Sequence, residues 1–386
     1  MIKYLTNKSE SGHLFQDLTN QINVLQYQKD KSEFKLILTL INKVSKNIHR
    51  FPLFLDKIKQ FLSFYEKCIN QTFSNQEIYN IYKNNKRILL LLIEMRILTI
   101  DQIITKLMLK KIYDLDGFYS RVKGSYGEID SSKFEYFHEK LSSYLSFLSY
   151  FYPEIKQFLT KYELTKIEKE MKKQNESIMN DFDKNRKIGE NESYICQLIR
   201  QDLIEEFVSY VNRYNISVST QILPSIFETN RFLCIRKPTL IEYAAFYGSI
   251  QIFKYLRLNH AELLPSLWLY AIHGKNPEII HLLEQDQILP EDKSYLECFE
   301  ESIKCHHNDI ADYIYDNLIN QDAANNEDDY KKNKIAFGFR YHNYKYFKKN
   351  VSNSQFILYY ASTNDYLTIV KILIYSGKVD INKSII

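Results

Sequence analysis

The sequence predicts an all-α protein, in which an N-terminal helical domain precedes a solenoid of short helix-turn-helix units. Three observations lead to this prediction. Apolar residues recur at the spacing of helix faces through most of the 386 residues. Glycine and proline, which punctuate all-β and glycine-rich folds, number only 9 and 7. One pattern of two short helices recurs through the C-terminal half, as in repeat proteins.

Charge and cysteine content narrow the class of protein. The 51 Lys and Arg against 47 Asp and Glu give a net charge of +4, which is too small to indicate a nucleic-acid or membrane partner by itself. Five sparse cysteines, with no apolar signal core at the N-terminus, predict free thiols and a cytoplasmic location. The most apolar run, residues 88–100, contains Glu94 and Arg96 and is too short to span a membrane.

Residues 1–171 are expected to form the N-terminal helical domain. Glycines 117, 124 and 127 predict that residues 114–132 are the main loop of this domain. Residues 172–191 contain few apolar residues that could enter a core, so we expect a linker or an exposed helix end there. The repeat region is expected to span 192–386. Helix-period apolar residues predict helices over residues 34–48, 53–69, 87–100, 103–113, 134–151 and 154–171.

The best-formed unit of the repeat region is residues 238–256. Thr239 is expected to cap its first helix. Ala244 and Ala245 have small side chains that let another helix approach closely. Gly248 tolerates the left-handed conformation that ends a helix, and Ser249 then caps the second helix. A pair of helices this short needs stacked neighbours to bury its apolar face.

Similar units follow along the chain. Leu198 and Ile199 replace the alanine pair in an earlier unit, where Asp202 stands for the glycine. In the unit around Ser302, Cys305 occupies the position of the turn glycine. Residues 338–347 are expected to form a further, degenerate unit. The anchors at 244, 271, 302 and 361 are 27, 31 and 59 residues apart. The predicted structural repeat positions are Ala244, Ala245, Gly248, Ala271, Gly274, Ser302 and Ala361.

These units resemble ankyrin repeats, because the first helix is alanine-rich and a glycine precedes the second. Residues 376–382 resemble the Gly-Ala-Asp-Val-Asn that closes a repeat of this family. Residues 186–283 are similar, more narrowly, to ankyrin-like proteins expanded in trichomonad protists, which carry a helical domain of unknown function beside their repeats. Units of 27 and 31 residues are shorter than the roughly 33 of an ankyrin repeat. The apolar end at Ile385 and Ile386 predicts a truncated product or further repeats.

The sequence contains few patterns that indicate chemistry. It has neither a glycine-rich phosphate loop nor a nucleophile elbow. Cys298, Cys305, His306 and His307 come nearest to a metal cluster, but they lack the paired spacing of zinc ligands. A turn with a packed thiol is the favoured interpretation of that run. We therefore expect no catalytic residue, no cofactor and no metal.

A basic aromatic segment, residues 331–349, offers an alternative. It holds seven Lys and Arg, no acid, and six Phe and Tyr. Aromatic rings stack on bases and lysines pair with phosphates, so the segment is a candidate binding patch for nucleic acid or another acidic surface. The favoured interpretation is a degenerate repeat, because the aromatic residues fall at helix-core positions. The basic residues of the patch are Lys331, Lys332, Lys334, Arg340, Lys345, Lys348 and Lys349.

Short helix pairs that need stacked neighbours, together with the absence of a catalytic motif, predict a non-enzymatic scaffold for protein–protein interaction. Its partner is a protein that the sequence does not identify. Binding of nucleic acid or an acidic surface through 331–349 is the alternative function.

Overall fold

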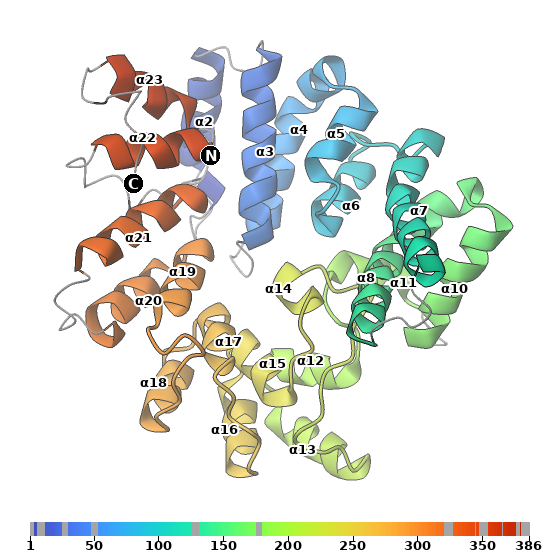
Figure 1. Cartoon of the computed structure of the whole chain (residues 1–386), viewed down its shortest axis with the longest axis vertical. Helices are drawn as coiled ribbons and strands as arrows, with labels where there is room; N and C mark the ends of the chain where they lie inside the picture. Colours follow the sequence, from blue (N-terminus) through green and yellow to red (C-terminus); the bar gives the residue numbers. More distant parts are fainter. Residues whose placement is uncertain are drawn as a thin grey trace.

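The computed structural model describes residues 4–5, 12–24, 30–47, 53–125, 131–174, 180–319, 327–343, 345–346, 354–364, 366–375 and 379. Over these residues the chain is helical (Figure 1), and its β pairing is limited to one isolated bridge between Gln221 and Thr239. The all-α prediction is confirmed. None of the described helices combines the length and the apolarity needed to cross a bilayer.

The helices of the N-terminal half share one hydrophobic core, which extends from Tyr4 to Phe227. Loops of a few residues separate most neighbouring helices, so consecutive helices pack against each other. The elements are α2 (Gly12–Val24), α3 (Lys31–Asn47), α4 (Phe54–Thr72), α5 (Asn75–Tyr82), α6 (Lys86–Glu94), α7 (Gln102–Ser125), α8 (Ser131–Tyr150), α9 (Tyr152–Ile155), η1 (Lys156–Phe158), α10 (Lys161–Gln174) and α11 (Phe182–Ile188).

Some expectations for this half are wrong. In the loop expected at 114–132, α7 continues through Gly117 and Gly124 to Ser125 and α8 begins at Ser131, while Gly127 lies outside the described residues. Each glycine costs a helix only about 1 kcal/mol, which the remaining residues of a long helix offset. The helix expected over 87–100 ends earlier, at Glu94, and Arg96 has a φ of 59° that reverses the chain. Leu98 is nevertheless buried in the core.

The segment expected to be a linker, 172–191, contributes to the first core. It contains α11, whose Phe182 packs edge-on against Phe227 at a ring distance of 5.2 Å. Arg186 of the same helix is buried and pairs with Glu154 at 2.8 Å. A paired arginine can be buried at little net cost, so a polar sequence did not prevent this helix from packing.

The C-terminal half consists mainly of helix pairs. The first helices α12, α15, α17, α19, α21 and α22 contact one another in that order, and the second helices α13, α16 and α18 contact one another outside them (Figure 1). The elements are α12 (Tyr194–Gln201), α13 (Ile204–Arg213), α14 (Arg231–Cys234), α15 (Leu240–Tyr247), α16 (Ile250–Leu258), α17 (Leu267–Gly274), α18 (Pro277–Gln285), α19 (Leu296–Lys304), α20 (Asn308–Tyr313), η2 (Ile314–Leu318), α21 (Glu327–Arg340), α22 (Ser354–Thr363) and α23 (Leu367–Tyr375).

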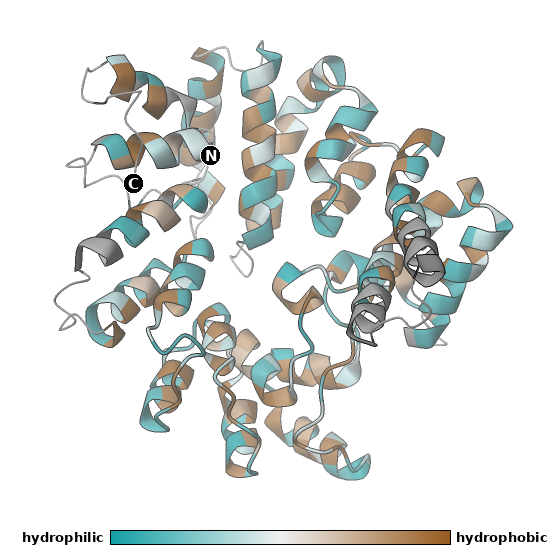
Figure 2. Ribbon diagram, viewed as in Figure 1, coloured by the Kyte–Doolittle hydropathy of each residue, from teal (hydrophilic) through white to brown (hydrophobic). Residues whose placement is uncertain are grey.

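Burial differs between first and second helices. All eight residues of α15 are buried, because this helix has neighbours on every side. The second helices have one buried side, and Figure 2 shows hydrophobic and hydrophilic residues alternating along α13, α16 and α18. In α16, Ile252 and Phe253 are buried while Lys254 is exposed. This pattern is the one expected of a surface helix.

Candidate functional site

The turn between paired helices has the same geometry in successive pairs. Five turns have a residue with a positive φ, and after four of these residues the next N–H donates to a carbonyl five residues back, as in a Schellman motif. In the turn of Lys275, its own N–H donates to Ala271 O at 3.2 Å, and the five-residue bond recurs in the turn before α23. The positive-φ residues are Asp202, Gly248, Lys275, His306 and His342, with φ of 53°, 70°, 55°, 58° and 56°. The N–H to O bonds run from Leu203 to Leu198 (3.1 Å), Ser249 to Ala244 (2.9 Å), His307 to Ser302 (2.9 Å), Asn343 to Gly338 (2.8 Å) and Tyr366 to Ala361 (2.9 Å).

Two residues have roles different from those that the sequence indicated. His306, not Cys305, takes the place of the turn glycine, since Cys305 has a φ of −80°. In the unit of Ala271 the left-handed residue is Lys275, and Gly274 is the last residue of α17. A left-handed residue other than glycine costs about 1–2 kcal/mol. Tertiary packing outweighs that cost here, so glycine is a poor guide to these turns.

Gly274 serves the close approach of α15 and α17. A Cβ at this position would lie 2.0 Å from the backbone oxygen of Ala245. A Cβ on Gly248 would likewise lie 2.7 Å from the oxygen of Gly274. Ala244 and Ala271 are fully buried in the same stack. Glycine at 248 and 274 therefore allows the backbones of neighbouring helices to come into contact.

A row of side-chain hydrogen bonds joins each helix pair to the one before it. Each donor follows the turn after a first helix, and Ser249, Asn276 and His307 are the N-cap residues of α16, α18 and α20. Each acceptor is a backbone carbonyl in or at the end of the preceding first helix. We call these bonds the rungs. They run from Ser249 Oγ to Ile199 O (2.5 Å), Asn276 Nδ2 to Gly248 O (3.0 Å), His307 Nδ1 to Ile272 O (2.8 Å), Asn343 Nδ2 to Ile303 O (3.0 Å) and Tyr366 Oη to Phe339 O (3.2 Å).

Capping is also shared between pairs. Ser249 occupies the N-cap position of α16, but its hydroxyl makes the rung and does not cap the helix. Asp202 of the preceding turn caps α16 instead, because its carboxylate accepts from the N–H groups of Gln251 and Ile252 at 3.1 and 3.0 Å. Thr239, in contrast, forms the expected cap of α15, within a capping box with Glu242. Neighbouring pairs thus complete each other's helix ends.

Three metal-ligating side chains meet between α17 and α19. His273 Nε2 lies 3.0 Å from Glu301 Oε1, and Cys305 Sγ lies 3.9 Å from His273 Nε2 and 3.8 Å from Glu301 Oε1. His273 and Cys305 are buried. We call these three residues the His–Glu–Cys cluster.

The cluster shares only Cys305 with the run that the sequence singled out. His307 Nδ1 is engaged in a rung, and His306 Nε2 bonds to Tyr341 O at 3.1 Å. The i, i+4 spacing of Glu301 and Cys305 is a local signal that could have been noticed. Nothing local links them to His273, which lies in the preceding repeat unit.

Burial sets the protonation of the cluster. It lowers the pKa of His273, so the imidazole is neutral near pH 7. Burial opposes ionisation of Glu301, but the hydrogen bond from His273 and the ammonium of Lys304 at 2.8 Å hold its pKa below the usual range. Burial and the negative charge of Glu301 raise the pKa of Cys305, which keeps its proton.

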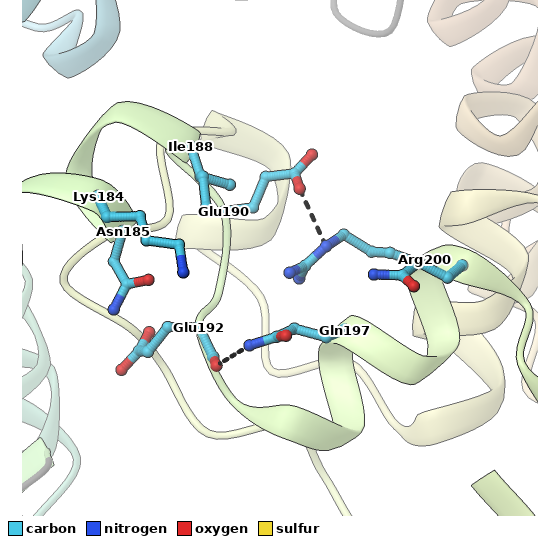
Figure 3. Close-up of a pocket in the computed structure, with 8 residues that line it drawn as sticks. Lys184, Asn185, Ile188, Glu190, Glu192, Gln197 and Arg200 are labelled. Atoms are coloured by element: carbon cyan, nitrogen blue, oxygen red, sulfur yellow. Dashed lines mark hydrogen bonds and ion pairs between the residues drawn. The ribbon is translucent and has the colours of Figure 1, made fainter. Parts of the chain in front are cut away.

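A pocket of about 300 Å³ lies where the two halves of the chain join (Figure 3). Two of its polar side chains are held by contacts within the chain. Arg200 Nε contacts Glu190 Oε2 at 2.9 Å, and Gln197 Nε2 donates to Glu192 O at 2.7 Å. Figure 3 shows the side chain of Glu190 directed at Arg200 and that of Gln197 directed at the backbone of Glu192. The lining residues are Lys184, Asn185, Ile188, Glu190, Glu192, Gln197, Arg200 and Gln201. This set contains no nucleophile with an adjacent base.

A buried lysine and a buried glutamate lie at the same junction. Lys86 of α6 donates to the carbonyls of Ile226 and Glu228 at 3.0 and 3.3 Å, which ties the first core to the repeat region. The carboxylate of Glu228 accepts one bond, from Asn230 N at 2.7 Å, and its Oε2 has no hydrogen-bond partner. Burial raises the pKa of Glu228 to about 7. This carboxyl group is therefore poised to titrate near neutral pH.

The described residues of the basic segment have partners within the chain. Lys334 lies over the ring of Tyr315 at 4.0 Å, Arg340 pairs with Glu300 at 2.8 Å, and Lys345 pairs with Asp312. Lys332 is exposed. The aromatic residues Phe337, Phe339 and Tyr346 are buried. The side chain of Lys331 and the whole of Lys348 and Lys349 lie outside the described residues.

Comparison with protein-family models, curated proteins and solved structures found no match to this chain.

Proposed function

We propose that the helix pairs from residue 192 onward form an ankyrin-like solenoid, and that the protein is a non-enzymatic scaffold that binds another protein. The observation that carries this proposal is the row of rungs, in which every donor lies five residues after the anchor of its own pair and four of the five acceptors lie one residue after the anchor of the preceding pair. In such a stack the repeated contacts join neighbouring units. The long outer surface remains available to a partner.

The second helices offer the best candidate for that surface. A left-handed residue lies two residues after the end of each of α13, α16 and α18: Asn215, His260 and Gln287, with φ of 49°, 62° and 55°. Within two residues of each lies an exposed apolar side chain. These are Tyr214 (58% exposed), Leu258 (72%) and Leu289 (51%), which we call the outer row. Exposed apolar and aromatic side chains near the corresponding turns of adjacent units suit a protein partner with a matching apolar strip.

Other features agree with a scaffold. The pocket at the junction holds side chains that already pair with each other, so the proposal assigns no catalytic residue. All five cysteines are free, which fits the reducing cytoplasmic setting that we propose. We propose no nucleic-acid role for 331–349, because Lys334, Arg340 and Lys345 have partners within the chain.

Proximity labelling with the full chain in the cells that express it tests the proposal. We expect a reproducible protein partner that is lost when Tyr214, Leu258 and Leu289 are all changed to Ser. A matched control changes Val24, Phe64 and Ile103, which are 79%, 56% and 60% exposed in the N-terminal half. This control should keep the partner. The same proteins labelled by both variants and by the wild type would contradict a partner that binds the outer row.

A further inference from the structure

The His–Glu–Cys cluster has the ligand types and the close spacing of a metal site. Four ligand atoms at about 2.0–2.3 Å from a tetrahedral zinc ion lie about 3.3–3.8 Å from one another. The three atoms of the cluster, His273 Nε2, Glu301 Oε1 and Cys305 Sγ, are separated by 3.0, 3.8 and 3.9 Å. Cys305 Sγ also lies 3.5 Å from His273 Nδ1, so it lies beside the ring and off the line of the Nε2 lone pair. The Cys305 side chain must therefore rotate to share an ion with His273 Nε2 and Glu301.

The donor set selects the kind of ion. A thiolate sulfur and an imidazole nitrogen favour zinc and similar transition metals, whereas magnesium and calcium prefer oxygen ligands alone. We propose that His273, Glu301 and Cys305 bind a zinc ion between α17 and α19. Binding forms a Zn–S bond and breaks the S–H bond of Cys305, whose proton leaves to solvent. One thiolate and one carboxylate offset the two positive charges of the ion, and the one positive charge that remains is that of Lys304, whose side chain is 30% exposed to solvent.

The surroundings hold the ligands in place. The ring of His273 packs against Phe232 and Phe246 at centroid distances of 4.2 and 5.0 Å. Lys304 anchors the carboxylate of Glu301 at 2.8 Å. Supporting contacts of this kind fix ligand orientation in metal sites. Three protein ligands leave a fourth position, and the Glu301 side chain is the most accessible of the three at 12% exposed. A water molecule on that side would complete the tetrahedron.

The ligands come from two consecutive repeat units, so the ion would link them. His273 lies in the last turn of α17, and Glu301 and Cys305 lie in α19 and at its C-cap. The bound ion stabilises this interface because an unfolded chain does not hold the three ligands together. The inference does not depend on the identity of the protein partner.

Titration of the chelator-treated full chain with Co²⁺, a spectroscopic substitute for zinc, tests the site. We expect one equivalent to bind, with a thiolate-to-cobalt charge-transfer band and the visible bands of a tetrahedral ion. Cys305→Ser should abolish the charge-transfer band, and His273→Gln should weaken binding by at least about tenfold. Matched controls are Cys68→Ser, at a partly buried site, and His281→Gln, whose side chain is 77% exposed. Both should bind cobalt as the wild type does.

X-ray absorption of the zinc-loaded wild type removes any dependence on the folding of the variants. We expect one sulfur at about 2.3 Å and nitrogen or oxygen ligands at about 2.0–2.2 Å. The proposal is overturned by the lack of stoichiometric binding, by a coordination shell without sulfur, or by a charge-transfer band that survives in folded Cys305→Ser.

Discussion

Replacing Gly274 with alanine tests whether backbone contact between α15 and α17 governs the packing of the repeat region. Gly274 is helical, so helix propensity alone favours alanine by about 1 kcal/mol. The added Cβ would lie 2.0 Å from Ala245 O, a backbone atom that cannot rotate away. The two helices must move apart by about 1 Å to restore ordinary contact. Overpacking of this kind costs about 1–3 kcal/mol, and a rigid neighbour places the cost at the upper end.

Helix propensity stabilises Gly274→Ala by about 1 kcal/mol, and overpacking destabilises it by about 3 kcal/mol. The expected net effect is a loss of about 2 kcal/mol in the free energy of unfolding. Trp268 provides the assay, because it is the only tryptophan and it is fully buried in α17, where its Nε1 donates to Ile288 O at 2.6 Å. Its fluorescence follows the repeat region during urea unfolding. With a slope of about 2 kcal/mol per molar, the midpoint should fall by about 1 M urea.

Gly12→Ala is the control for this measurement. Gly12 is the first residue of α2, and no atom lies within 4 Å of its hypothetical Cβ. Its midpoint should match the wild type. A Gly274→Ala protein that is as stable as the wild type, or more stable, would refute the reasoning, because propensity would then outweigh packing at this site.

Three further predictions concern a rung, a buried acid and the basic segment. Ser249→Ala removes the hydrogen bond to Ile199 O and should cost about 1 kcal/mol in urea unfolding, whereas Ser209→Ala, on the exposed side of α13, should cost less than about 0.5 kcal/mol. Burial raises the pKa of Glu228 from 4.5 to about 7, so stability that is present below pH 4.5 is lost as the pH rises through 7. The loss amounts to about 3 kcal/mol, and Glu228→Gln should flatten this part of the pH profile of stability; an unchanged profile would contradict it. Single-stranded RNA should not be retarded by the protein in a shift assay at low salt, and a salt-sensitive shift would reinstate the segment 331–349 as a binding patch.

Local sequence patterns predicted the helix pairs because their causes are local. Helix-period apolar residues and the capping box of Thr239 and Glu242 both act within a few residues. The alanines at 244 and 245 indicated close packing for the same reason. The positions of glycine were a less reliable guide to the turns, since Lys275 and His306 adopt the left-handed conformation that we expected of glycine.

Contacts between units could not be predicted in the same way. The hydroxyl of Ser249 bonds to the preceding pair, and Asp202 caps a helix that lies 49 residues away along the chain. The His–Glu–Cys cluster likewise combines His273 with two residues of the next unit. Anchor spacings of 27 and 31 residues differ enough to hide which positions face each other. A sequence pattern with a variable period does not specify register between units.

The rungs also indicate where the chain can accommodate insertions and deletions. The step from an anchor to the next rung is fixed, as from Ala244 to Ser249 and from Ser302 to His307. The distance between anchors, in contrast, ranges from 23 residues, between Gly338 and Ala361, to 46, between Leu198 and Ala244. Insertions and deletions are therefore accommodated in the connections between pairs and excluded from the turns within them. Evolution can lengthen such a protein between pairs, or add whole pairs, without altering the hydrogen bonds that align the existing ones.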